Sequence, residues 1–475
     1  MKKPNILFLF DDQHNASCLG YAGHPFIKTP NLDKLAQKGA SFNNMYACSA
    51  LCCPSRTSFY TGTYVRTHGH AHNDGDLLKS LPSILTELGK DGYTRIQTGK
   101  NHLPPSVAKD FDDMWTEKTQ HNGKEYKEKG VTFKLDEPWS QHFHSGCWGF
   151  EEKHHRGVWT AQKTIDFLDS KDSKENPFFC WTSFAPPHSP HMPPESLDNM
   201  YKPEDIPIDW EEYYRFEQSK MQKRPMVEDF WKLGSVRHDI KIFQKAVCRY
   251  FALITLVDRE IGRILESLED NGLSDNTIVI FTADHGDFAG EYGQLGKNLP
   301  AYDPLIKIPF IYYDPYNPYH GRVVESMFQN VDLFPTLMDR LGLPVPPTVH
   351  GKSFLPALAG HPGCYREQVF SETAMEKTIR TKDWKLTYFV RHPHKGQLFR
   401  MSPEVNEIDN LWSDPNYQYI KIELLEDLMA WMVTCEQPDS MCSTWEEYIS
   451  TPWYDWLKEQ PRENAVQETI KLNEH

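Results

Sequence analysis

The chain has 475 residues and a formal net charge of -15. Its hydrophobic content of 39% and aromatic content of 13% are typical of a globular protein large enough for two domains, and they exclude a disordered chain. The acidic balance argues against nonspecific nucleic-acid binding, although a local cluster of Lys, Arg, His and metal can still bind an anion.

No apolar run approaches the roughly 20 residues that a membrane span requires. The first four residues lead directly into an apolar run with no visible signal peptide. We therefore expect a cytoplasmic protein, or a periplasmic or secreted one if an export signal was removed. The ten cysteines form neither a zinc pattern nor a dense disulfide framework, so free thiols are expected.

The first predicted element is a strand over residues 5–10 that ends in Asp11 and Asp12. Its continuous apolar run is typical of a strand buried on both faces of a parallel sheet. Ligands of open α/β sheets bind at the carboxyl ends of the strands. Two adjacent carboxylates are costly to bury there without a cation or hydrogen-bond donors. The alternative for this pair is a helix N-cap.

A helix opened by Thr29 and Pro30 follows, and then the sequence Cys-Cys-Pro-Ser-Arg begins at Cys52. Pro54 suits the first turn of a short helix that Gly62 would end. Cys52 would then lie just before a helix N-terminus, where the helix dipole lowers the pKa of a thiol. The alternative is a small buried cysteine without a function.

Three further strands are predicted, the last two of them as buried apolar runs, and each ends in polar residues. They cover residues 93–98 before Lys100 and His102, residues 177–184 before His188, and residues 277–282 before Asp284 and His285. One more strand is predicted at residues 309–313, and helices at residues 81–88, 160–168, 242–268 and 331–341. Each polar cluster alone is also compatible with a surface turn. Because loops at one edge of a sheet converge, the polar clusters taken together predict one site.

Two long segments interrupt this alternation, residues 104–160 and residues 193–235. The first is rich in Trp and His, and it either walls a substrate pocket or packs as a surface excursion. After residue 375 the pattern changes to an antiparallel strand pair and a helix over residues 420–433. We predict an α/β fold with a large mixed, mostly parallel sheet between helices in residues 1–375. A smaller C-terminal α+β subdomain is predicted for residues 376–475.

The sequence C-x-P-S-R from Cys52, followed by Thr61-Gly62, resembles the signature of the type I, formylglycine-dependent sulfatases of the alkaline phosphatase superfamily. In that family the first Cys is oxidised to formylglycine, an aldehyde whose hydrate is the nucleophile. Cys53 fills the variable position. The resemblance covers most of the chain and continues in the same order through residues 5–12, 29–32, 99–102, 187–188, 257–262, 282–286, Lys297 and residues 331–337.

The resemblance implies a metal site made by the modified Cys52 and four further ligands. These are Asp11, Asp12, Asp284 and His285. Oxygen-rich ligands favour Ca²⁺, Mg²⁺ or Mn²⁺. Many sulfatases have Asn where this chain has His285. Ca²⁺ is the ion we expect, and the histidine leaves Mn²⁺ or Zn²⁺ open.

Five further residues receive roles in the reaction from the resemblance. Arg56 and Lys100 would orient the aldehyde hydrate. His102 would take the proton that lets the covalent sulfate intermediate collapse to aldehyde and free sulfate. His188 and Lys297 would bind sulfate and assist the leaving group.

The resemblance implies an enzyme that hydrolyses a sulfate monoester, with a sugar or small organic alcohol as the leaving group. It also implies maturation by a formylglycine-generating or an anaerobic sulfatase-maturing enzyme. The first alternative is a phosphonate monoester or phosphodiester hydrolase with the same nucleophile. The second is a binding protein that keeps the fold and the metal without turnover.

Overall fold

The computed structural model describes residues 2–116, 134–135, 145–221, 234–236, 239–297, 301–317, 319–361, 366–390, 392, 394–402 and 407–435. The chain divides into two compact units, Met1–Leu428 and Met429–His475. The second unit is described only for the final residues of helix α16 (Gln418–Cys435). Residues 436–475 of the predicted C-terminal subdomain lie outside the described residues.

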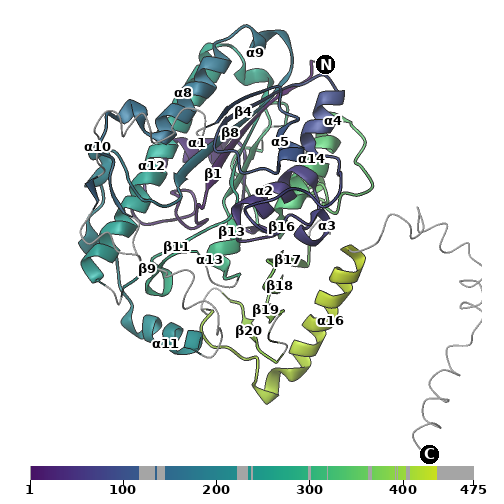
Figure 1. Ribbon diagram of the computed structural model, residues 1–475. Helices are drawn as coiled ribbons and strands as arrows, with labels where there is room; N and C mark the ends of the chain where they lie inside the picture. The colour runs from purple at the N-terminus through teal and green to yellow at the C-terminus, as the bar shows by residue number, and fades with distance from the viewer. Residues whose placement is uncertain are drawn as a thin grey trace, which may run out of the picture. The chain divides into compact units, whose positions relative to one another are not determined.

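An eight-stranded sheet forms the centre of the first unit (Figure 1). In spatial order its strands are β15 (Arg322–Val324), β2 (Ala40–Phe42), β14 (Phe310–Tyr313), β10 (Thr277–Ala283), β1 (Asn5–Asp12), β8 (Phe178–Pro187), β4 (Thr94–Gly99) and β5 (Asp113–Thr116). Strands β10, β1, β8, β4 and β5 run parallel, whereas β14 runs antiparallel to β10 and β2. The predicted mixed, mostly parallel sheet is confirmed.

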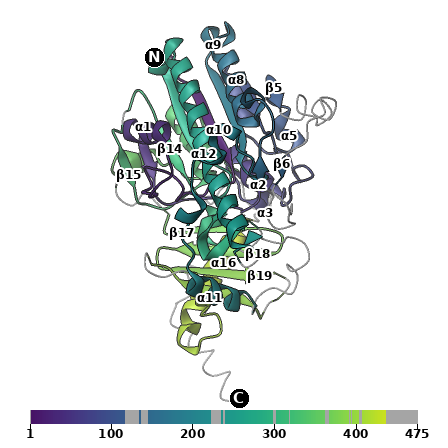
Figure 2. The same ribbon diagram turned by 90° about the vertical axis from the view of Figure 1, so that its left-hand side faces the viewer.

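The central strand β1 explains why helices cover both faces of the sheet. All eight of its residues are buried. Because successive side chains point to opposite faces, its phenylalanines and leucines enter two different cores. One core includes helices α2 (Cys52–Thr61), α4 (Ile84–Lys90) and α14 (Leu333–Leu341). The other includes α1 (Pro30–Lys38), α8 (Arg156–Leu168) and α12 (Ile240–Asp270), of which α8 and α12 lie side by side in Figures 1 and 2.

The predicted helices are present, with shifted first residues. The helix expected at residues 81–88 begins at Ile84, because the Ser83 side chain caps it by accepting from the backbone N–H of Thr86 at 3.1 Å. The helix expected from residue 160 begins earlier, at Arg156. Apolar periodicity identifies the core-facing turns of a helix, whereas its ends depend on the capping residues.

The two long segments contain short elements of their own. The first contributes α5 (Pro105–Ala108), β5, β6 (Lys134–Leu135), β7 (Gly146–Cys147) and a 3-10 turn, Glu152–His154; residues 117–133 and 136–144 lie outside the described part. Strand β5 pairs with β4 and extends the main sheet, which the sequence analysis missed because the strand has only four residues. The second segment contributes α10 (Glu195–Asp198), a turn at Pro203–Asp205, α11 (Trp210–Met221) and β9 (Gly234–Ser235).

A four-stranded antiparallel sheet follows the main sheet in sequence. It contains β17 (Gln368–Glu372), β18 (Glu376–Thr381), β19 (Trp384–Phe389) and β20 (Gly396–Arg400). The predicted antiparallel pair is β19 with β20. Because β17 precedes residue 376, the sheet begins upstream of the predicted boundary, and the division of the chain there stays a prediction.

The remaining short elements are α3 (Val65–His68), α9 (Asp172–Glu175), α13 (Asp303–Ile306), α15 (Leu355–Leu358), β3 (Met45–Tyr46), β11 (Phe288–Ala289), β12 (Gln294–Gly296), β13 (Lys307–Ile308), β16 (Phe328–Gln329), and the 3-10 turns Ser274–Asn276, Glu291–Gly293, Asn330–Asp332 and Pro415–Tyr417. Within the described residues, no helix has the length and apolar character needed to cross a membrane.

Candidate active site

The carboxyl ends of four parallel strands meet at one edge of the main sheet. Asp12 is the last residue of β1, and the register that pairs Asp11 with Ala283 brings it beside Asp284 after β10. Lys100 follows β4, and His188 follows β8. The predicted convergence of the polar clusters is therefore present in the fold, because neighbouring parallel strands end at the same edge.

Helix α2 brings Cys52 to this edge. Cys52 is its first residue, Leu51 is the cap position, and Gly62 ends the helix in the left-handed conformation at φ 63°. The Ser55 hydroxyl donates to the backbone oxygen of Asp284 at 2.5 Å. The side-chain amide of Asn330 in turn donates to Ser55 Oγ at 3.0 Å. The first bond attaches the helix to the end of strand β10, and the second attaches it to the 3-10 turn Asn330–Asp332.

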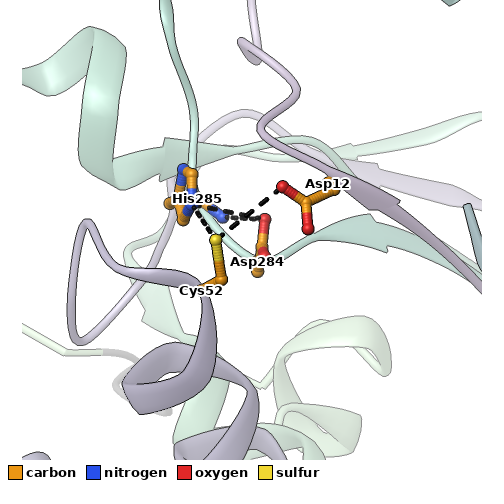
Figure 3. A group of neighbouring side chains, drawn as sticks. All are labelled: Asp12, Cys52, Asp284 and His285. Atoms are coloured by element: carbon orange, nitrogen blue, oxygen red, sulfur yellow. Dashed lines mark hydrogen bonds and ion pairs between the residues drawn. The ribbon is translucent and has the colours of Figure 1, made fainter. Parts of the chain in front are cut away.

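Four buried side chains form a compact group at the centre of the site (Figure 3). Asp12, Cys52, Asp284 and His285 each offer one ligand atom, and these atoms lie within 4.8 Å of one another. Cys52 Sγ lies 3.2 Å from His285 Nε2 and 3.8 Å from Asp12 Oδ1. His285 Nδ1 donates to the backbone oxygen of Gly286 at 2.8 Å, which leaves Nε2 as the lone-pair atom of the neutral ring. Two carboxylates, one imidazole and the Cys52 side chain are a donor set that fits a divalent cation.

Asp11, the fifth predicted ligand, lies outside this group. Its Oδ2 is 2.8 Å from His14 Nδ1, and its buried Oδ1 has no hydrogen-bond partner among the described residues. Burial raises the pKa of Asp11 to about 6, against the opposing effect of His14. Its role as a ligand stays a prediction. The sequence analysis missed His14, although a histidine so close to two strand-end carboxylates was a usable signal.

Arg56 is fully buried and joins the two central carboxylates. Its Nη2 lies 2.7 Å from Asp12 Oδ2 and its Nε lies 2.9 Å from Asp284 Oδ2. Its Nη1 donates to Ser183 Oγ at 2.9 Å. Burial acts to lower the pKa of this guanidinium, but the two carboxylates outweigh it and raise the pKa. In this structure Arg56 therefore holds the carboxylates in place.

Cations surround the Cys52 thiol. Lys297 Nζ lies 3.0 Å from Cys52 Sγ and 2.9 Å from His285 Nε2, and Lys100 pairs with Asp12. Burial alone would raise the pKa of Cys52, but Lys297, Lys100 and His285 outweigh it and hold the pKa well below its usual value. The charges of the two lysines, and of His285 while its ring is protonated, stabilise an anion at this position, whether a thiolate or a bound substrate.

Two further predicted histidines lie beside the group. His102 lies close enough to Cys52 for the two side chains to interact, and burial lowers the pKa of His102. His188 Nε2 lies 3.9 Å from Asp12 Oδ1, and the side chain is 29% exposed. All predicted site residues thus lie at one edge of the sheet, with Asp11 facing away from the four-residue group toward His14. The arrangement can bind a tetrahedral anion and offers imidazoles for proton transfer, while the individual roles stay predictions.

A family model described as Sulfatase matches residues 4–343, and a second, described as N-sulphoglucosamine sulphohydrolase, C-terminal, matches residues 290–433. An arylsulfatase of Clostridium perfringens is 30% identical, and the match covers 90% of this chain and 94% of that protein. An N-acetylglucosamine-6-O-sulfatase of Bacteroides thetaiotaomicron is 27% identical, with coverage of 90% and 85%.

A phosphonate monoester hydrolase of Agrobacterium radiobacter has a similar solved structure. The TM-score is 0.77 at 24% identity, and the match covers 91% of this chain and 96% of that one. At this identity the likeness concerns the fold. It agrees with the large mixed sheet and the small C-terminal sheet described above.

Proposed function

The chain belongs to the sulfatase family, and from that premise we propose that it releases inorganic sulfate from a sulfated saccharide, with Cys52 converted to formylglycine. The observation that carries this proposal is the position of Cys52. It is the first residue of a buried helix, inside a four-residue group of metal-binding type, and 3.0 Å from a lysine. The similarity to an N-acetylglucosamine-6-O-sulfatase supports a saccharide as the leaving group.

In this proposal a formylglycine at position 52 supplies a hydroxyl of its aldehyde hydrate as the nucleophile. A divalent cation held by Asp12, Asp284, His285 and residue 52 would neutralise the charge of the sulfate group. Ca²⁺ is the ion we propose, and Mn²⁺ and Zn²⁺ are the alternatives that His285 leaves open.

The chain's own residues bind the sulfate and move protons. Lys100 and Lys297 bind sulfate oxygens, because both ammonium groups already lie beside the Asp12 and Cys52 side chains. His102, which lies beside residue 52, accepts the proton of the hydroxyl that remains on the sulfated intermediate, as the C–O bond to sulfate breaks and the aldehyde re-forms. His188 protonates the leaving oxygen, since its partly exposed ring borders the open side of the site.

The test combines the mass of the peptide that contains Cys52 with kinetics on protein from a host that has a converting enzyme. We expect an aldehyde in place of the thiol, and release of inorganic sulfate from 4-nitrophenyl sulfate and from sulfated monosaccharides. Cys52→Ala should abolish turnover. An unmodified thiol in fully active protein would refute the proposed nucleophile. Absence of turnover by fully modified, metal-loaded protein would favour the binding-protein alternative.

The second candidate is hydrolysis of a phosphonate monoester with the same site. Two observations support it: the similarity in fold to a phosphonate monoester hydrolase, and His285 in the four-residue group. The family resemblance gives His at this position to phosphonate monoester hydrolases and to some carbohydrate sulfatases, so the histidine alone does not separate the two. The ratio of kcat/KM for an aryl sulfate and for an aryl phosphonate monoester separates the two. A strong phosphonate preference would replace the first proposal.

A further inference from the structure

A cavity of about 650 Å³ adjoins the proposed catalytic residues. Lys100, His102 and His188 line it on the side of the site. The loop that follows helix α3 contributes His70 and Asp74 to its wall. A leaving group attached to a sulfate beside Cys52 would therefore extend into a cavity whose wall includes this loop.

The hydrogen bonds of His70 fix which of its nitrogens carries the proton. Its ring is 3% exposed, and Nδ1 lies 2.9 Å from Thr57 Oγ1. The Thr57 hydroxyl donates its proton to the backbone oxygen of Cys53 at 2.8 Å. The hydroxyl has one proton and a carbonyl oxygen can only accept, so both contacts are hydrogen bonds only when Thr57 Oγ1 accepts from Nδ1–H of His70.

A neutral imidazole has one N–H, so Nε2 of His70 is a bare acceptor. Burial lowers the pKa of His70, which keeps the ring neutral. Within the described part of the chain Nε2 has no hydrogen-bond partner, while the residue lines the cavity. Asp74, whose carboxylate also only accepts when ionised, lines the same cavity.

We propose that His70 Nε2 accepts a hydrogen bond from a hydroxyl group of the leaving alcohol, and that the cavity thereby selects polyhydroxylated sulfate esters. This inference rests on the proposed sulfatase function and narrows its substrate class. An acceptor wall favours a saccharide, which presents several O–H donors. It gives no hydrogen-bonding advantage to an aryl sulfate such as 4-nitrophenyl sulfate, whose ring carries no O–H group.

The test compares three kinds of substrate on the mature, metal-loaded enzyme. These are 4-nitrophenyl sulfate, monosulfated hexoses and N-acetylhexosamines, and deoxy analogues of the best sugar that lack one hydroxyl at a time. We expect one deoxy analogue to lose about 10- to 100-fold in kcat/KM, the range for leaving one buried acceptor unpaired. The variant His70→Phe keeps the ring shape without an acceptor. It should lower kcat/KM for the parent sugar by a similar factor, and it should not lower kcat/KM for the affected deoxy analogue any further.

His70→Gln, which places an amide oxygen near the position of Nε2, should recover part of the loss. His72→Phe changes an exposed histidine that does not line the cavity, and it is the matched control. The mass of the Cys52 peptide and the melting temperature are measured for every variant.

Three results would overturn the inference while leaving the sulfatase activity itself standing. The first is turnover of the aryl sulfate with no turnover of any sugar. The second is an equal loss by His70→Phe on sugar and aryl sulfate, which indicates a structural role. The third is a deoxy penalty that persists in His70→Phe. If His70→Phe fails to fold, the kcat/KM values of the deoxy sugars are compared between the wild type and His70→Gln, and a deoxy penalty that is equal in both overturns the inference. Failure on every sulfate ester would instead refute the proposed function.

Discussion

Replacement of Arg56 by methionine should destabilise the protein because it removes a cation that forms ion pairs with both central carboxylates. The Asp12 and Asp284 side chains are fully buried, and Arg56 lies 2.7 Å and 2.9 Å from them. Removing one partner of a buried ion pair costs about 3–5 kcal/mol. Asp12 keeps Lys100, and Asp284 keeps two backbone N–H donors, so we expect one such loss rather than two.

A loss of this size is a large part of the about 5–15 kcal/mol by which a domain is stable. Denaturant unfolding should therefore show Arg56→Met folded in buffer, with a midpoint clearly lower than that of the wild type. Arg366→Met is the matched control, because Arg366 Nε lies 2.9 Å from Asp332 Oδ2, another fully buried carboxylate. That pair is not part of the four-residue group.

The two variants should respond differently to a divalent cation. In chelator both should lose a similar free energy of unfolding. Added Ca²⁺ or Mn²⁺ should restore stability to Arg56→Met beyond its effect on the wild type, because a cation beside Asp12 and Asp284 replaces the lost charge. The same addition should stabilise Arg366→Met by no more than it stabilises the wild type. A stability of Arg56→Met within about 1 kcal/mol of the wild type, or equal rescue of both variants, would refute this reasoning.

Three further predictions concern the elements that carry the site. Burial lowers the pKa of His155 from 6.5 to about 3, so the folded state binds fewer protons than the unfolded state between these values. The free energy of unfolding should be full above pH 6.5 and should fall on acidification by about 1.4 kcal/mol per pH unit. His155→Asn, which keeps a cap for helix α8, should remove this contribution to the pH dependence. An unchanged pH dependence of that variant in denaturant titrations would contradict the role of His155. A Cβ at Gly99 would lie 2.1 Å from the Ser183 backbone oxygen at φ 87°, so Gly99→Ala should cost about 3 kcal/mol or more. Gly92→Ala, with φ 81° and nothing within 4 Å, should cost only about 1–2 kcal/mol, and equal melting temperatures of the two variants would contradict the steric argument. Asp258 accepts from the backbone N–H groups of Asn31 and Leu32 at the start of helix α1, so Asp258→Ala should cost about 1–2 kcal/mol in thermal unfolding, and no change would show that water replaces the cap.

The sequence alone determined the buried strands and the residues at their ends. Strands β1, β8 and β10 are continuous apolar runs, and such runs are stable only when both faces of the strand are covered. Pro54 lies in the first turn of the helix of Cys52 and Gly62 ends it, and both depend on backbone geometry that is local in the chain. Local patterns of this kind also suffice to recognise the sulfatase motif.

Only the tertiary structure decided which groups meet. The antiparallel direction of β14 and the addition of β5 depend on pairing partners far away in sequence, and neither has a local signal. Asp11 and Asp12 are neighbours, yet one faces His14 and the other faces Cys52, because alternate residues of a strand point to opposite sides. The acceptor role of His70 Nε2 likewise depends on a hydroxyl of helix α2, that of Thr57. Hydrogen bonds between distant residues fix such orientations, and a pattern read along the chain does not contain them.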